Sequence, residues 1–275
     1  MSFDIAIVGR GKVGRALAAA LLPVVHRGGR EPPVPLRAEV VLFAVRDGQL
    51  PTLATAYAGY LEADVVLHVA GAVNADVLAP LRPAAVGQWH PVLSFVDDDV
   101  DFQGAAALIT GDAKARVVGG QLAKRLGMRA VEAQEHIDLA LYHAALALSA
   151  NGMAALAASA ERLLGAAGLE GEAAEAMLGP LLASVAANVG RVGAAAAMSG
   201  PVRRGDASTI ARHLARLTEV APEELPLYRA SVQAQLAIAR RLGEASPEAL
   251  QGVAATISDV TVSTMLQETD ESGPT

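Results

Sequence analysis

Residues 4–14 read DIAIVGRGKVG, and this stretch decides the fold. Asp4–Val8 has the character of a short buried strand, and a GxGxxG motif with glycines at Gly9, Gly11 and Gly14 follows it at once. A strand that runs into this motif and then into a helix indicates a dinucleotide-binding Rossmann turn. The first glycine permits a tight turn, the second lets the backbone approach a pyrophosphate, and the third allows close helix–strand packing. The helix N-terminus favours the phosphates. An alternative is a glycine-rich turn that binds no ligand.

The first half of the chain alternates short apolar runs with helical or turn-rich stretches, which is the signature of a parallel sheet built from βαβ units. A helix is expected from Lys12 to Leu22, and another from Ala113 to Leu126, with Asp112 as N-cap and Gly127 after its end. The runs predict strands at Asp4–Val8, Val24–Arg27, Val40–Val45, Asp64–Ala70, Ala85–Trp89, Ala106–Thr110 and Met128–Val131.

Strand signals stop near residue 133, and long Ala- and Leu-rich segments broken by Gly and Pro follow. The sequence therefore predicts an α/β fold with a Rossmann-type, doubly wound, mostly parallel sheet, followed by an all-α domain. The expected domains are residues 1–133 for the dinucleotide and residues 134–275 for substrate and dimerisation. The polar, acidic tail from about residue 267 is expected to be disordered.

Composition narrows the class of protein. The formal net charge of −7 is unlike a general nucleic-acid surface, so we expect no nucleic-acid partner. The chain has no cysteine, which excludes disulfides and fits a cytoplasmic protein, and its start shows no signal-peptide pattern. The histidines lack metal-ligand spacings, so no metal site is expected.

The uncharged segment Leu139–Ala160 is long enough to span a bilayer. Its polar side chains and many alanines favour a buried helix instead, and no membrane partner is expected. Together with Ala176–Gly190 it has more uncharged surface than a small helical domain can bury alone. Large apolar surfaces mark interfaces, so we expect a homodimer built on residues after about 135.

The end of the second predicted strand indicates which dinucleotide binds. NAD-selective sites usually place a carboxylate there, whereas this chain has Arg27, followed by Arg30. A guanidinium can bind a 2′-phosphate bidentately, so NADP(H) is the expected cofactor; the alternative is two solvated loop arginines. The expected cofactor-binding residues are Gly9, Arg10, Gly11, Lys12, Val13, Gly14, Arg27, Arg30, Val45, Arg46, Ala70 and Gly71.

Several motifs together resemble a family. They are Gly9–Gly14, Phe43–Asp47, His68–Ala72, Trp89–Phe95, Tyr142–Ala145, Ser149–Asn151 and Gly200–Thr209. Over nearly its whole length the chain resembles the bacterial Rossmann-like proteins provisionally assigned as NADP oxidoreductases, whose helical C-terminal domain has no assigned function. More distantly it is similar to pyrroline-5-carboxylate reductase, ketopantoate reductase and β-hydroxyacid dehydrogenases. The resemblance implies hydride transfer to a carbonyl or imine of a small acid, and dimerisation through the helical domain.

The second domain departs from the β-hydroxyacid dehydrogenases, which carry a catalytic lysine on its first helix. The corresponding helix here offers His143 and, two turns or about 12 Å further, Asn151. His143 could deliver the proton that accompanies hydride transfer, and Asn151 could orient the substrate. The alternative is an ordinary packed helix in which both side chains are satisfied by backbone groups.

Two more histidines end strands at the edge where doubly wound sheets bind ligands. His90 is the second candidate proton donor, held extended by Pro91, and His68 is a candidate substrate contact. Either could instead be an ordinary strand-end residue.

A loop before a predicted helix contains Arg203, Arg204 and Asp206. A loop arginine in this position suits a carboxylate or phosphate, and Arg204 is the preferred anchor for an anionic substrate. Asp206 is a candidate substrate contact that an N-cap role alone would also explain.

These residues predict an NADP-dependent oxidoreductase acting on the carbonyl or imine of a small anionic substrate, held between the sheet edge and the helical domain. Two alternatives remain open. One is a non-catalytic NADPH-binding sensor or scaffold, and the other is a hydride exchanger between NADP and a deazaflavin.

Overall fold

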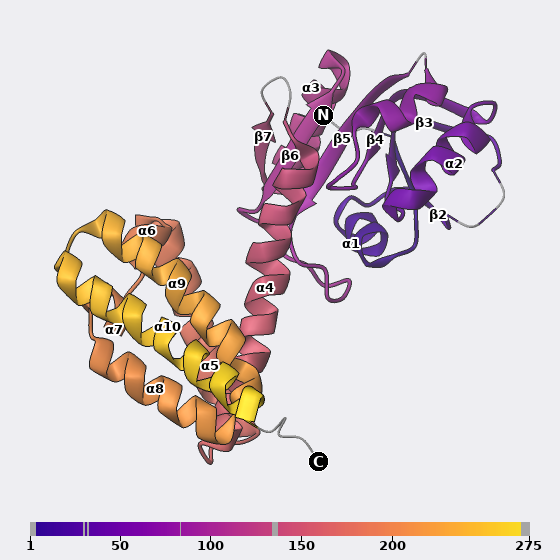
Figure 1. Ribbon diagram of the computed structural model, residues 1–275. Helices are drawn as coiled ribbons and strands as arrows, with labels where there is room; N and C mark the ends of the chain where they lie inside the picture. Colours follow the sequence, from indigo (N-terminus) through magenta and orange to yellow (C-terminus); the bar gives the residue numbers. More distant parts are fainter. Residues whose placement is uncertain (1–3, 30, 32, 83, 134–136, 271–275) are drawn as a thin grey trace. The chain divides into compact units, whose positions relative to one another are not determined.

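The computed structural model describes residues 4–29, 31, 33–82, 84–133 and 137–270 (Figure 1). The chain divides into two compact units, residues 1–152 and residues 153–275. The sequence suggested a boundary at 133, where strands end. The first unit continues to residue 152 because the start of helix α4 (Leu139–Ala166) bonds to the sheet, through the contact between Tyr142 and His90.

The first unit is built on a seven-stranded sheet, and every strand expected from the sequence is present. The strand order is β2-β1-β3-β4-β5-β6-β7, and all neighbours are parallel except β5 and β6. This confirms a Rossmann-type, mostly parallel sheet. The strands are β1 (Ile5–Val8), β2 (Val25–Arg27), β3 (Leu36–Phe43), β4 (Leu61–His68), β5 (Ala85–Val92), β6 (Ala106–Gly111) and β7 (Arg129–Glu132).

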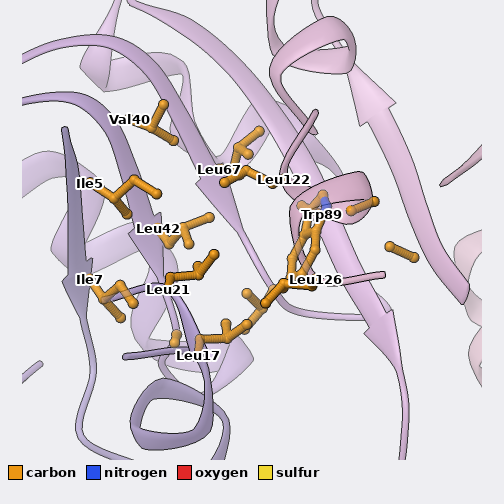
Figure 2. Close-up of a cluster of buried hydrophobic side chains, with 14 of the residues drawn as sticks. Ile5, Ile7, Leu17, Leu21, Val40, Leu42, Leu67, Trp89, Leu122 and Leu126 are labelled. Carbon is orange, nitrogen blue, oxygen red and sulfur yellow. The ribbon is translucent and has the colours of Figure 1, made fainter. Parts of the chain in front are cut away.

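Alternating strand residues feed two hydrophobic cores, one on each face of the sheet. On one face Ile5, Ile7 and Leu42 pack with residues of α1 (Lys12–Ala20) and α3 (Ala113–Arg125), as Figure 2 shows. On the other face Ala6 and Val41 pack with α2 (Leu50–Tyr57) and the short helix η2 (Ala75–Leu81). Because both faces are covered, the buried second halves of the central strands are apolar, as in Val40–Phe43 of β3 and Val65–Leu67 of β4.

Local signals set where these helices start and end. Asp112 precedes α3, as expected, but its carboxylate accepts a hydrogen bond from the Val86 amide (2.8 Å) instead of capping the helix. Gly127 follows α3 with a φ of 69°, a conformation that favours glycine. Helix α2, which begins with Leu50-Pro51, is absent from the sequence prediction, as is the short helix η1 (Asp47–Gln49) before it.

The second unit is helical. Its core includes Ile210 and Leu214 of α8 (Ala207–Val220), Leu236 of α9 (Leu225–Leu242) and Val253 of α10 (Pro247–Asp270). Helix α10 runs through Asp270, so residues 267–270, expected to be disordered, are helical, and 271–275 lie outside the described residues. After α4 the helices are α5 (Glu172–Val192), α6 (Ala194–Ala197), α7 (Pro201–Arg204), α8 (Ala207–Val220), η3 (Pro222–Glu224), α9 (Leu225–Leu242) and α10 (Pro247–Asp270).

Helices α4 and α5 are the exception to this packing, and the expected burial of Leu139–Ala160 is wrong. Leu141 is 70% exposed, Leu148 is 77% exposed, and the only buried side chain of α4 is Ser159. By length and composition both helices could cross a membrane, with mean hydropathy of 1.4 and 1.2. This is weak evidence, because apolar helices that pack against protein pass the same test.

Candidate active site

The glycine motif forms a turn in which each glycine has a separate steric reason. Gly9 has a φ of 134°, and a Cβ there would lie 2.0 Å from the Ala44 carbonyl oxygen. A Cβ on Gly14 would lie 1.9 Å from the Gly9 oxygen, so α1 packs closely against the turn. A Cβ on Gly11 would meet nothing within 4 Å. Two glycines are therefore required by packing, whereas the space beside Gly11 is open, as a site for an approaching phosphate needs.

The rest of the turn follows the expected pattern. Lys12 is the first residue of α1 and is exposed, and Val13 is partly buried against the core. The short α1 gives the turn a helix N-terminus with no acidic side chain in its first turn. Free N–H groups and the helix dipole at this position favour an anion.

The strand ends that should enclose a cofactor meet at one edge of the sheet, because β1, β3, β4 and β5 are mutually parallel. A cleft of about 350 Å³ opens there. Its lining comes from the glycine turn, the end of β2 and the loop after β3, and consists of Gly9, Arg10, Gly11, Gly28, Gly29, Ala44, Val45, Arg46 and Gln49. This is the crevice outside the carboxyl ends of strands, at the switch point between β1 and β3, where doubly wound sheets bind ligands.

Arg27 lies at the end of β2, beside β1. Its backbone carbonyl supports the glycine turn, because it accepts a hydrogen bond from the Gly9 N–H (2.8 Å). Its side-chain Nε is buried and makes no hydrogen bond with any described residue. Arg10 is 3.2 Å from a Glu31 carboxylate oxygen, in an exposed ion pair. The expected second arginine, Arg30, lies outside the described residues.

His90 and His143 converge on Gly71. A Cβ on Gly71 would lie 2.7 Å from His143 Cδ2 and 2.9 Å from His90 Nε2. His90 stands at the end of β5, which continues past the end of β4, and His143 is in the first turn-and-a-half of α4. The two imidazole rings have centroids 6.4 Å apart. Glycine at 71 is therefore what allows two imidazole groups to share this position.

Burial makes His90 a neutral ring at neutral pH. Burial, reinforced by the neighbouring His143, lowers the pKa of His90 to about 4, and Asp47 opposes the shift. The Tyr142 hydroxyl lies 2.8 Å from His90 Nδ1, and burial raises the pKa of Tyr142 to about 12. A positive charge on the His90 ring would be repelled by one on His143, which is part of the reason that His90 stays neutral.

Gln88 fixes the backbone at the end of β4 and was not foreseen as a site residue. Its side-chain amide is wholly buried and donates to the carbonyls of Ala70 (2.7 Å) and Gly71 (3.2 Å), while its oxygen accepts from Thr110 (3.2 Å). Ala70 and Gly71, both expected at the cofactor site, are thus held by a side chain from the next strand. The signal for it was a single polar residue inside the otherwise apolar predicted strand Ala85–Trp89.

His68 differs from the other described histidines because it is wholly buried. Burial lowers its pKa to about 4, with the Asn74 backbone opposing the shift, and neither ring nitrogen makes a well-aligned hydrogen bond to a described residue. His68 is therefore a desolvated, neutral ring near His90. Asn151 is an exposed residue of α4, two turns beyond His143.

The three candidates of the helical unit have different environments. Arg203 forms a bidentate ion pair with Glu244 and donates to the carbonyl of Ala196. Asp206 caps α8, accepting from the Thr209 N–H (3.0 Å), and hydrogen bonds from Thr209 lower its pKa to about 2. Arg204 is exposed and precedes Gly205, whose φ is 71°. Of the two arginines, Arg204 is the one not engaged with a described carboxylate.

Titratable side chains that could hold a metal are dispersed. Within the described part of the chain, no three His, Asp or Glu residues lie together as a metal site would require.

Comparisons with known proteins match this architecture. Residues 105–235 match the model of a domain of unknown function, DUF2520. A provisionally assigned NADP oxidoreductase from Bacteroides fragilis, BF3122, aligns with a TM-score of 0.68 at 20% identity, over 85% of this chain and 98% of that chain. A pyrroline-5-carboxylate reductase from Coxiella burnetii aligns with a TM-score of 0.55 at 13% identity, over 95% and 98%.

A third solved structure contains a cofactor. The pyrroline carboxylate reductase of Plasmodium falciparum, with NADP bound, aligns with a TM-score of 0.52 at 14% identity, over 91% of this chain and 98% of that chain. No curated protein matches the sequence. The resemblance expected from the sequence is confirmed at the level of fold: this chain is built like the NADP oxidoreductases and pyrroline-5-carboxylate reductases, and it carries a DUF2520 match from residue 105 to residue 235.

Proposed function

We propose that the protein is an NADP-dependent oxidoreductase that acts on the carbonyl or imine group of a small anionic substrate. The observation that carries the proposal is that a phosphate-binding turn and a pair of imidazoles lie at the same edge of one sheet, at Gly11 and Gly71. The similar fold of reductases, one of them with NADP bound, supports it.

The cofactor residues fit a dinucleotide with a phosphorylated ribose. The open space beside Gly11 suits the pyrophosphate, and the N-terminus of α1 faces it. Arg27 has a buried Nε to which no described residue bonds, at the end of β2, the position that meets the adenine ribose in such sheets. Arg10 would be a second cation near the same phosphate once it leaves Glu31. NADPH, when bound, would supply the hydrogen with two electrons that reduces the substrate carbon.

The chain's own residues would manage the proton. His143 gives its proton to the carbonyl oxygen or imine nitrogen as the carbon is reduced, and regains one from solvent, to which it is exposed. His90, neutral because burial lowers its pKa to about 4, donates a hydrogen bond without transferring its proton. Arg204 is the proposed anchor for the substrate's negative charge, and Asn151 the proposed orienting amide.

We also propose that the protein is a homodimer through α4 and α5. In α5 the exposed residues Met177, Leu181, Val185, Val189 and Val192 recur every three or four positions, so they form one stripe. An apolar stripe of this length without charge is the signature of a helix that packs against protein. A second copy brings an identical stripe, which closed two-fold symmetry can satisfy.

The function is tested by a screen of small 2-oxo acids and cyclic imines with NADPH, following the loss of its absorbance, and of small hydroxy acids with NADP⁺, following the gain. With an active substrate, His143→Ala should lower turnover by about 10²–10⁴-fold, the usual contribution of a general acid, with little change in NADPH affinity. His213→Ala, which changes an exposed histidine of the helical unit, is the matched control. Full turnover in His143→Ala together with loss of turnover in His90→Ala would show that the donor is His90.

A further inference from the structure

The contact between Tyr142 and His90 has a geometry that decides where the imidazole carries its proton. The two rings meet edge to face, with centroids 5.7 Å apart and planes at 84°. The hydroxyl oxygen is 2.8 Å from Nδ1, whereas the ring nitrogen nearest the Cβ position of Gly71 is Nε2. A bond of this length can run in either direction, so the proton inventory of both groups is needed.

The proton inventory assigns Tyr142 as the donor of this hydrogen bond. Burial raises its pKa to about 12, so the hydroxyl keeps its proton at neutral pH. Nδ1 of His90 is its sole hydrogen-bond partner among the described residues, and a partly buried hydroxyl proton without an acceptor is costly. Nδ1 must then be a bare acceptor. Because His90 is a neutral ring, its single proton is on Nε2.

Nε2 of His90 lies beside Gly71, just past the carboxyl end of β4. A Cβ on Gly71 would lie 2.9 Å from this nitrogen, and no hydrogen bond joins Nε2 to any described residue. His143 approaches the same position from α4. The other titratable groups around His90 are His68 on β4 and Asp47 in η1. Only Tyr142 bonds directly to its ring.

We propose that Tyr142 is a positioning residue, which fixes His90 as the Nε2–H tautomer so that His90 and His143 present two donors to one substrate atom, a carbonyl oxygen. A carbonyl oxygen has two lone pairs and can accept a hydrogen bond from His90 while it takes the proton from His143. An imine nitrogen has one lone pair and cannot do both. The inference rests on the proposed function of this site and narrows it to carbonyl substrates.

The tautomer of His90 and its hydrogen bond to Tyr142 can be measured without any ligand, by long-range nitrogen–proton NMR of the histidine rings in the full chain. The wild type should show His90 with its proton on Nε2 and with Nδ1 accepting a hydrogen bond. In Tyr142→Phe the Nδ1 resonance should move to that of an unbonded nitrogen. Tyr228→Phe is the matched control, because Tyr228 bonds to Nδ1 of His213 (2.6 Å) in the helical unit and should alter only that histidine.

Turnover completes the test. Tyr142→Phe should lower turnover of a 2-oxo acid by about tenfold, the equivalent of one hydrogen bond, with NADPH affinity within twofold of wild type. A proton on Nδ1 in the wild type, an unmoved Nδ1 resonance in Tyr142→Phe, or turnover of cyclic imines alone would overturn the proposal. Failure of the proposed function would appear differently, as absence of NADPH binding by the wild type, while the NMR result on the histidine would still decide the tautomer.

Discussion

The hydroxyl of Tyr142 and Nδ1 of His90 are 2.8 Å apart, although 52 residues separate them in the chain. This contact joins the first turns of α4 to the end of β5. It brings His143, the next residue of α4, to the position beside Gly71 where His90 also arrives. The placement of both imidazoles at this sheet edge thus involves one hydrogen bond and one glycine.

Gly71→Ala tests the steric part of this arrangement. The added methyl group would lie under 3.0 Å from atoms of both imidazoles, so the rings must move. We expect turnover to fall by at least about tenfold, because misplacement of a proton donor by an ångström is costly. Gly120→Ala is the control, since a Cβ there meets nothing within 4 Å. Unchanged turnover in Gly71→Ala would show that the two rings are not both needed.

The buried His68 predicts how stability depends on pH. Its folded pKa of about 4 is below the ordinary 6.5, so the unfolded chain takes up a proton first as the pH falls. His68 therefore contributes stability above pH 6.5 that is lost between pH 6.5 and 4, and His90 acts in the same direction. In His68→Leu the melting temperature should fall less across this window, measured by circular dichroism. Parallel curves for both proteins would contradict the buried neutral ring.

Arg27→Ala tests the basis of cofactor choice. The variant should lose most of the preference for NADPH over NADH, because the 2′-phosphate loses a charge-assisted contact while the rest of the cofactor is unaffected. Calorimetric titration with both cofactors measures this. Arg37→Ala is the control, since Arg37 is an exposed residue of β3 paired with Glu62. A preference that survives in Arg27→Ala would assign the phosphate to another cation, such as Arg10.

Substitution of the α5 stripe tests the proposed dimer. Leu181→Glu places a charge on a residue that is 59% exposed in the single chain and should give a monomer by light scattering at micromolar concentration. Ala183→Glu adds the same charge nearly half a turn around the helix and should remain dimeric. A wild-type monomer would refute the dimer, and binding of the wild type to lipid vesicles would assign the stripe to a membrane surface.

Sequence patterns were sufficient where the signal was local. Strand runs, the glycine turn and the glycine after α3 are set by neighbours along the chain, and the structure has them. Strand β3 begins at Leu36, whereas the prediction placed its start at Val40. The first four residues alternate between buried and exposed, and the charged residues among them hid the strand signal. Helix α2 was missed because no capping residue marks its start, and because Pro51, which can break a helix, is also compatible with the first turn of one.

The remaining features depend on contacts between distant residues. No pattern within Tyr142–Ala145 indicates that the tyrosine bonds to His90, because a stripe on a helix does not specify which strand it meets. The role of Gln88 likewise depends on which backbone carbonyls end β4 beside it. The exposure of the uncharged segment Leu139–Ala160 was missed because such a segment has the same composition whether it packs inside its own chain or against a second one.

The central claim is that the turn at Gly9–Gly14 binds NADP(H), and equilibrium titration of the wild-type protein with NADPH and NADH tests it most directly. We predict that NADPH binds at least ten times more tightly than NADH, since one charge-assisted contact contributes about 1.5–3 kcal/mol. Equal affinities would contradict the role of Arg27, and no binding of either cofactor would contradict the account as a whole.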